Sequence, residues 1–146
     1  MRPLTPGEPL TIDTGGHRRL TVRQRAQCHP GWSLGFRVGD ALAFMTDTAY
    51  DPYAVDLIRG VQVLVHEAWV TSWEAARLPE ATRSAHASAE EAGLLAREGG
   101  VGELLLSHLP PRGGEGAYAE MLAAARAVFP NTQLSHDGLS RLLPVV

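Results

Sequence analysis

Apolar runs alternate with polar segments along this chain, and three of the runs end at residues that carry chemistry. Short apolar runs bounded by polar residues predict buried strands. In open α/β sheets, ligands bind outside the carboxyl ends of the strands. We therefore expect a shared site where the three runs end. They are residues 41–45 followed by Asp47, residues 61–65 followed by His66 and Glu67, and residues 104–106 followed by Ser107 and His108.

The first half of the chain predicts an antiparallel meander. Turn residues stand at Gly15-Gly16 and at Gly39-Asp40, between segments with the composition of strands. A glycine-containing pair between two such segments is typical of a hairpin. Strands are expected at residues 10–13, 20–27, 33–38 and 41–46.

Helix signals appear only in the second half. Asp51 and Pro52 predict a helix over residues 52–59, because aspartate caps a helix and proline suits its first position. Ser88 and Glu91 form a capping box that begins a helix ending near residue 98. Apolar residues at helical spacing predict a third helix over residues 117–129.

The remaining segments of the second half predict strands and one long loop. Strands are expected at residues 61–65, 103–107, 133–135 and 139–143, and the loop contains Trp69 and Trp73. Hairpins followed by strand–helix alternation predict an α/β fold, with a mixed β-sheet and helices packed on one face.

Composition limits the class of protein. The chain has 146 residues, 45% of them hydrophobic, which fits one domain over residues 1–146. A net charge of −3 argues against a generally basic nucleic-acid surface. The single Cys28 excludes an intramolecular disulfide and fits a cytoplasmic location. We see no apolar run long enough to span a membrane and expect no secretion signal.

Five short motifs, taken in order, carry a family resemblance. The motifs are His29-Pro-Gly with Gly35-Phe-Arg, Thr46-Asp47-Thr48, His66-Glu67-Ala68, His86-Ala87-Ser88 and Ser107-His108. With these motifs, residues 25–140 resemble the C-terminal half of a metallo-β-lactamase-fold hydrolase, most of all the transfer-RNA 3′-processing (ribonuclease Z-like) branch.

The resemblance implies a role for each of five residues. His29, Asp47 and His108 match metal ligands, with Asp47 bridging two zinc ions. Glu67 and His86 match a carboxylate–histidine pair in which the histidine protonates the leaving oxygen. The residue types suit this chemistry, because imidazole and carboxylate bind zinc and two metals favour in-line displacement at phosphorus. Glu67 and His86 are therefore expected to be hydrogen-bonded to each other.

The chain departs from the family pattern in two places. The HxHxDH motif of the family's N-terminal half, which supplies most zinc ligands, is absent from these residues. Pro110-Pro111-Arg112 stands where a Ser-x-Arg-Tyr sequence is common in the branch. The isolated chain is therefore expected to bind zinc weakly or not at all and to show negligible activity.

Each candidate also has a simpler interpretation. His29 and Asp47 are residue types that occur in turns, and His86 precedes a helix that Ser88 already caps. Glu67 could neutralise Arg83. Other residues are assigned to packing or structure without a chemical role, namely His17, His66, His136, Trp69 and Trp73.

Three functional hypotheses follow. The first is a zinc-dependent hydrolase, of phosphodiesterase or RNA-processing type. The second is a non-catalytic remnant or interaction module that keeps half of the fold. The third is a half-enzyme completed by another chain, as in a truncated reading frame or a cut protein. The expected partners are a second copy of the chain or a chain supplying the missing half, with RNA or another phosphodiester as substrate and no membrane.

Overall fold

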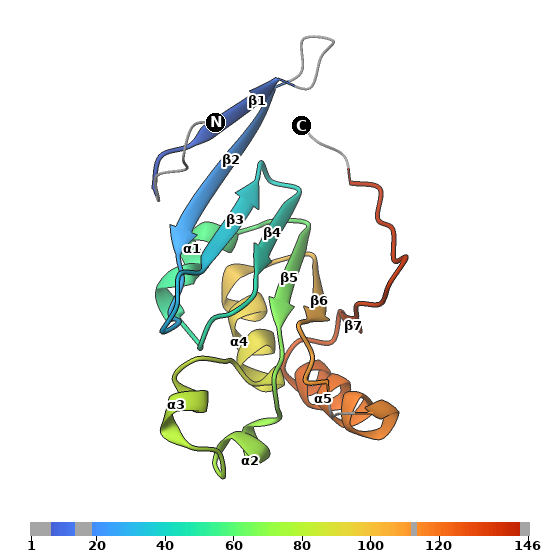
Figure 1. Ribbon diagram of the computed structural model, residues 1–146. Helices are drawn as coiled ribbons and strands as arrows, with labels where there is room; N and C mark the ends of the chain where they lie inside the picture. The colour runs from blue at the N-terminus through green and yellow to red at the C-terminus, as the bar shows by residue number, and fades with distance from the viewer. Residues whose placement is uncertain (1–6, 14–18, 112–113, 144–146) are drawn as a thin grey trace.

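The computed structural model describes residues 7–13, 19–111 and 114–143 of the chain. Its centre is a seven-stranded sheet in which spatial order follows sequence order (Figure 1). The strands are β1 (Leu10–Asp13), β2 (Arg19–Ala26), β3 (Leu34–Val38), β4 (Leu42–Met45), β5 (Val63–Glu67), β6 (Glu103–Ser107) and β7 (Thr132–Leu134).

The pairing of neighbouring strands changes from antiparallel to parallel at β4. Strands β1 to β4 form the antiparallel meander predicted from the sequence, whereas β4 to β7 are parallel. Met45 pairs with His66, and Glu67 pairs with Ser107. Parallel strands end at the same edge of a sheet, so the residues that follow β4, β5 and β6 are brought together there.

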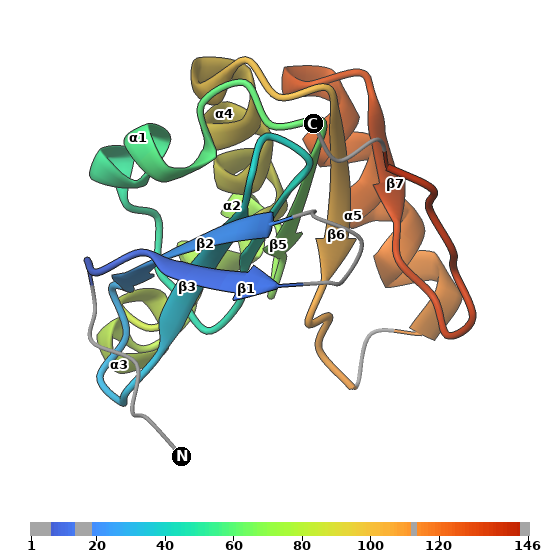
Figure 2. The same ribbon diagram turned by 90° about the horizontal axis from the view of Figure 1, so that it is seen from above.

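Three helices cover one face of the sheet. They are α1 (Val55–Ile58), α4 (Ala89–Gly99) and α5 (Gly114–Val128), and they lie side by side, with α4 between the other two (Figure 2). A 3-10 turn, η1 (Pro52–Ala54), precedes α1, and Asp51 caps it as expected. The core between sheet and helices includes Met45, Leu64, Leu95 and Leu106. This confirms the predicted α/β class, with a mixed sheet and helices on one face.

The start and end of α4 follow from local chemistry. Ser88 accepts a hydrogen bond from the Glu91 amide, and the Glu91 side chain accepts one from the Ser88 amide, so the predicted capping box is present. The helix ends at Gly100, whose φ of 61° is in the left-handed region that favours glycine. Ser88, which is two residues after His86, therefore fixes where the helix begins.

The other face of the sheet is apolar and partly open. Phe36, Phe44, Val65 and Leu105 are paired in one row across β3 to β6 and lie on this face. Phe44 keeps 41% of its surface exposed. At one side of this face, Arg141 binds Glu103 and Gln133.

Three sequence-based predictions about elements are wrong. Strand β5 begins and ends two residues later than expected, so Glu67 is inside the strand. The expected loop at Trp69 and Trp73 contains two short helices, α2 (Ser72–Ala75) and α3 (Glu80–Arg83). Residues 139–143 form no strand.

Two of these differences, the bounds of β5 and the presence of α2, have a physical reason in the structure. Val61 follows Gly60 in a turn and is buried in the core, so its apolar side chain reflects packing and not a strand. Helix α2 is started by a capping box between Thr71 and Glu74.

No described helix is long and apolar enough to cross a membrane.

Candidate functional site

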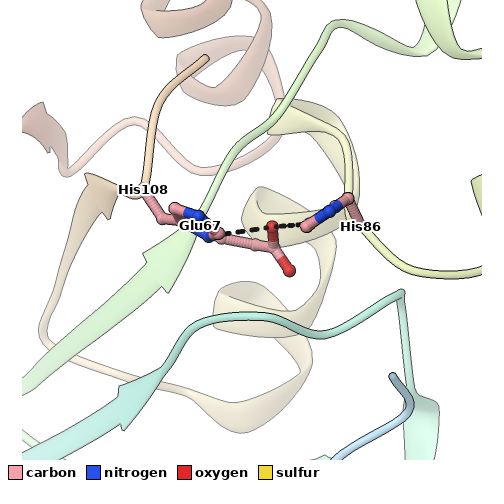
Figure 3. Close-up of side chains that lie close together, drawn as sticks. All are labelled: Glu67, His86 and His108. Atoms are coloured by element: carbon pink, nitrogen blue, oxygen red, sulfur yellow. Dashed lines mark hydrogen bonds and ion pairs between the residues drawn. The ribbon is translucent and has the colours of Figure 1, made fainter. Parts of the chain in front are cut away.

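A buried carboxylate lies at the centre of the candidate site. Glu67, the last residue of β5, has no exposed surface. Its Oε1 accepts a hydrogen bond from the Thr48 amide, in the loop that follows β4. Its Oε2 lies 2.8 Å from His86 Nδ1 (Figure 3). The hydrogen bond expected between Glu67 and His86 is therefore present.

His86 is held by the segment that joins α3 to α4. The His86 amide donates to the Thr82 carbonyl oxygen over 3.1 Å, and the Trp69 amide donates to the Ala87 carbonyl oxygen over 2.9 Å. The imidazole of His86 stacks on the Trp69 indole, with ring centroids 4.6 Å apart and planes 18° apart. Because Nδ1 faces Glu67, Nε2 is the nitrogen left for a substrate or ion.

His108 approaches the same carboxylate from β6. Its Nδ1 lies 3.5 Å from Glu67 Oε2 (Figure 3). The same nitrogen lies 3.8 Å from Asp47 Oδ1. This nitrogen is buried and makes no hydrogen bond to any described residue. A buried polar atom without a partner is unfavourable unless a ligand completes its contacts.

Asp47 and His108 share an unusual backbone conformation. Their φ angles are 55° and 46°, and among the described residues they are the two non-glycine residues with positive φ. This conformation is costly for residues with a β-carbon, and it concentrates at functional sites. Its occurrence at the ends of two neighbouring strands points to a functional demand on both side chains.

His29 lies beside the other histidines. Its ring meets that of His86 edge to face, with centroids 5.5 Å apart. His29 Nδ1 accepts a hydrogen bond from the Gly31 amide, so Nε2 remains for a ligand. The Ala49 amide donates to the Cys28 carbonyl oxygen over 2.7 Å and ties this loop to the end of β4.

We call Glu67, His86, His108, Asp47 and His29 the edge cluster. The structure thus brings together all five residues singled out in the sequence, from five separate segments of the chain. Their individual roles remain predictions.

Burial controls the protonation of the central pair. Burial raises the pKa of Glu67 to about 8, although the amides of Thr48 and Ala87 favour the charged form. Burial also lowers the pKa of His86, against the opposing effect of Asp47. Both shifts favour an uncharged pair at neutral pH when no ion is bound.

Part of the edge cluster could hold a metal ion. Glu67, His86 and His108 each offer one ligand atom, and these atoms lie within 4.8 Å of one another. This set differs from the predicted ligands His29, Asp47 and His108 by including the carboxylate–histidine pair. The two sets share His108, whose buried Nδ1 has no hydrogen bond.

Other sequence-based interpretations are resolved by contacts. Arg83 pairs with Glu80, so the suggested pairing of Glu67 with Arg83 is wrong. His66 is buried, donates to the Glu67 carbonyl oxygen and has its pKa lowered to about 4 by burial. His136 is exposed, and its Nδ1 lies 3.0 Å from the Asp137 carbonyl oxygen. His17 lies outside the described residues.

Trp69 belongs to the surroundings of the site, which the sequence does not predict. The sequence predicts a packing role, yet the Trp69 ring also lies 5.2 Å from that of His108, tilted by 54°. Its position two residues after Glu67 is the signal that could have placed it beside the site.

Comparison with known proteins identifies the relatives of this chain. No protein-family model matches it. Ribonuclease BN of Escherichia coli (strain K12) is 34% identical over 133 residues, which are 90% of this chain and 43% of that protein. Ribonuclease Z of Synechococcus sp. (strain WH7803) is 36% identical over 140 residues, which are 94% of this chain and 40% of that protein. The chain is related to ribonuclease Z.

Solved structures agree on the fold of this ribonuclease Z-like chain. The metallo-β-lactamase fold protein YhfI from Bacillus subtilis superposes with a TM-score of 0.77 at 24% identity. The match covers 93% of this chain and 53% of YhfI. The ribonuclease Z-like chain therefore has part of the metallo-β-lactamase fold and spans less than half the length of the two ribonucleases.

Proposed function

We propose that this chain is the C-terminal part of a zinc-dependent hydrolase that cleaves phosphodiester bonds in RNA. The observation that carries the proposal is the convergence of Glu67, His86 and His108 at one sheet edge, in a chain related to ribonucleases. The chain matches 43% of ribonuclease BN, so the activity is proposed for the assembly that includes the rest of the fold.

The donor atoms of the edge cluster suit zinc. Imidazole nitrogen and carboxylate oxygen are usual zinc ligands, and the buried His108 Nδ1 has no competing hydrogen bond among the described residues. We assign His29, Asp47 and His108 as ligands. When bound, a pair of zinc ions supplies a Lewis acid for the phosphate and acidifies a bound water.

The neighbouring pair of residues would handle the proton of the leaving group. Glu67 holds His86 through Nδ1 and fixes the direction of the ring. A carboxyl group behind an imidazole orients the ring and fixes its tautomer. His86 would then give a proton from Nε2 to the leaving oxygen.

The missing ligands require a second lobe. We propose that this lobe carries an HxHxDH sequence and packs on the open sheet face, whether it belongs to the same polypeptide or to another. The open face ends at Glu67 and Ser107, beside the edge cluster, so a lobe placed there would reach the metal ligands. The single Cys28 is compatible with the cytoplasmic location that we propose.

The proposal is tested by adding back the second lobe. The isolated chain is compared with a form joined to an HxHxDH-containing lobe of a relative, by elemental analysis of zinc and by turnover of bis(p-nitrophenyl) phosphate. We expect zinc and activity only in the completed form, and Asp47→Ala should lower its turnover by about 100-fold. Tight zinc binding and turnover by the isolated chain would contradict the proposed need for a second lobe.

A second variant separates the two assignments of His86. If His86 is the proton donor, His86→Ala in the completed form should lower kcat by about 100-fold while zinc content stays near that of the parent. Equal losses of zinc and activity would make His86 a metal ligand, as the ligand-atom distances also allow.

A further inference from the structure

The Trp69–His86 stack borders two cavities. One has a volume of about 320 Å³ and includes Arg83 and Glu91 in its lining. The other has a volume of about 520 Å³ and is lined by Trp69, Ala81, Thr82, Ala85, His86, Pro110 and Pro111. We call the second one the proline cavity. Its volume is in the range of small-molecule sites.

The lining of the proline cavity suits a flat, uncharged group. Alanine and proline side chains supply apolar surface, and Trp69 and His86 supply two rings. Among the described residues that line it, the polar groups are the Thr82 hydroxyl, the His86 imidazole and the Trp69 indole N–H, and none is an aspartate, glutamate, lysine or arginine. A nucleobase stacks on aromatic rings and needs few hydrogen bonds, so it fits this lining.

The proline wall is fixed in place. Proline has a restricted φ angle, and the Tyr118 hydroxyl of α5 donates to the Pro110 carbonyl oxygen over 2.8 Å. A preformed wall lowers the entropy cost of binding.

The position of the cavity relates its occupant to the reaction. His86 lines the cavity and contacts Glu67 through Nδ1. A group in the cavity therefore lies next to the side chain assigned to protonate the leaving oxygen. We propose that the proline cavity binds the nucleobase of the nucleotide on the leaving side of the scissile phosphodiester. The assignment to the leaving side rests on the proposed function, whereas base binding in the cavity does not.

The test uses the metal-free isolated chain and measures binding, so it is independent of turnover. The chain has three tryptophans, and the indole N–H signal of Trp69 in a ¹H–¹⁵N spectrum is identified by its loss in Trp69→Phe. Adenosine 5′-monophosphate should shift this signal saturably, with a Kd of about 10 mM, the strength expected of one stacked base with few other contacts. Ribose 5-phosphate, which lacks the base, should leave it unchanged at the same concentration.

A filled cavity provides the matched comparison. Ala81 is exposed on α3 and lines the cavity, so Ala81→Leu should weaken nucleotide binding at least about 5-fold without disturbing the rest of the spectrum. Ala123→Leu, at an exposed position on α5, should leave the Kd unchanged. An equal shift with ribose 5-phosphate would show an anion site and overturn the proposal. A missing shift with the nucleotide, or equal binding by Ala81→Leu, would also overturn it.

The two proposals fail in distinguishable ways. If the isolated chain binds the nucleotide but the completed form shows no zinc and no turnover, the base-site proposal is supported and the hydrolase proposal is contradicted. If the completed form shows turnover but the Trp69 signal of the isolated chain does not shift, the hydrolase proposal is supported and the base-site proposal is contradicted.

Discussion

The buried carboxyl group of Glu67 contacts several groups of the candidate site. Its oxygens meet the Thr48 amide, His86 and His108, yet the side chain is fully buried. Burial disfavours the charged carboxylate and raises its pKa to about 8. The protonation of Glu67 is therefore coupled to folding of the metal-free chain.

This coupling predicts a pH-dependent stability. The folded state holds the Glu67 proton up to a pKa of about 8, whereas the ordinary value is 4.5. The stabilisation from this proton is complete below pH 4.5 and is lost as the pH rises to about 8. Glu67→Gln cannot titrate. The unfolding free energy of the parent minus that of Glu67→Gln should fall by about 2–4 kcal/mol between about pH 5 and pH 8.

Urea unfolding of both proteins in EDTA measures this difference. His66, whose pKa burial lowers to about 4, contributes in the opposite direction but is present in both proteins and cancels on subtraction. A difference that stays flat or rises with pH would show that Glu67 is ionised in the folded chain.

At the scale of elements, the sequence predicts those bounds that depend on local signals, such as capping residues and apolar runs. Strands β1 and β6 have the predicted bounds, and the Ser88 capping box begins α4 where expected. The end of β5 depends instead on pairing with β6, which hydrophobicity does not report. Helix α2 carried a readable signal in the Thr71–Glu74 spacing, but it is too short for a periodic apolar pattern.

The meeting of the candidate residues at one sheet edge and the Glu67–His86 hydrogen bond were predictable from the sequence, whereas the position of Trp69 was not. Strand order and parallel pairing explain why Asp47, Glu67 and His108 meet. The stacking of Trp69 on His86 depends on how the segment between β5 and α4 folds back through the Trp69–Ala87 hydrogen bond. That contact is a tertiary one, and no local propensity encodes it.

Close packing between elements gives a second prediction. A β-carbon at Gly102, just before β6, would lie 2.6 Å from the Gln62 carbonyl oxygen. Gly102→Ala should therefore lower the unfolding free energy by about 1–3 kcal/mol in urea unfolding. Gly116 in α5 has no neighbour within 4 Å of such a carbon, so Gly116→Ala should be neutral or stabilising by up to about 1 kcal/mol. Equal effects of the two substitutions would contradict this packing.

At the scale of the whole molecule, the open sheet face is unusual for an isolated chain. Leu10, Ile12 and Phe44 are exposed by 37%, 42% and 41%, and the strand pairing places all three on this face. Exposed apolar surface of this kind marks an interaction site. In the absence of a second lobe, a second copy of the chain is the expected cover.

Self-association through this face is the third prediction. We expect the isolated chain to form dimers in light scattering coupled to size exclusion. Phe44→Lys should shift the population to monomer, because a charge would be buried in the interface. Tyr53→Lys, at an aromatic residue exposed by 80% in η1, should leave the dimer intact. A parent protein that stays monomeric at all concentrations would contradict the prediction.

The left-handed backbone at Asp47 and His108 also bears on the history of the chain. Glycine adopts this conformation without the cost that a β-carbon adds, which is about 1 kcal/mol per residue. If the site were no longer needed for catalysis, selection for stability would favour glycine at both positions, since glycine removes this cost. A lineage still using the site would keep the less stable aspartate and histidine. The residues found at positions 47 and 108 in related sequences would therefore distinguish a half-enzyme that still works from a remnant that has lost its function.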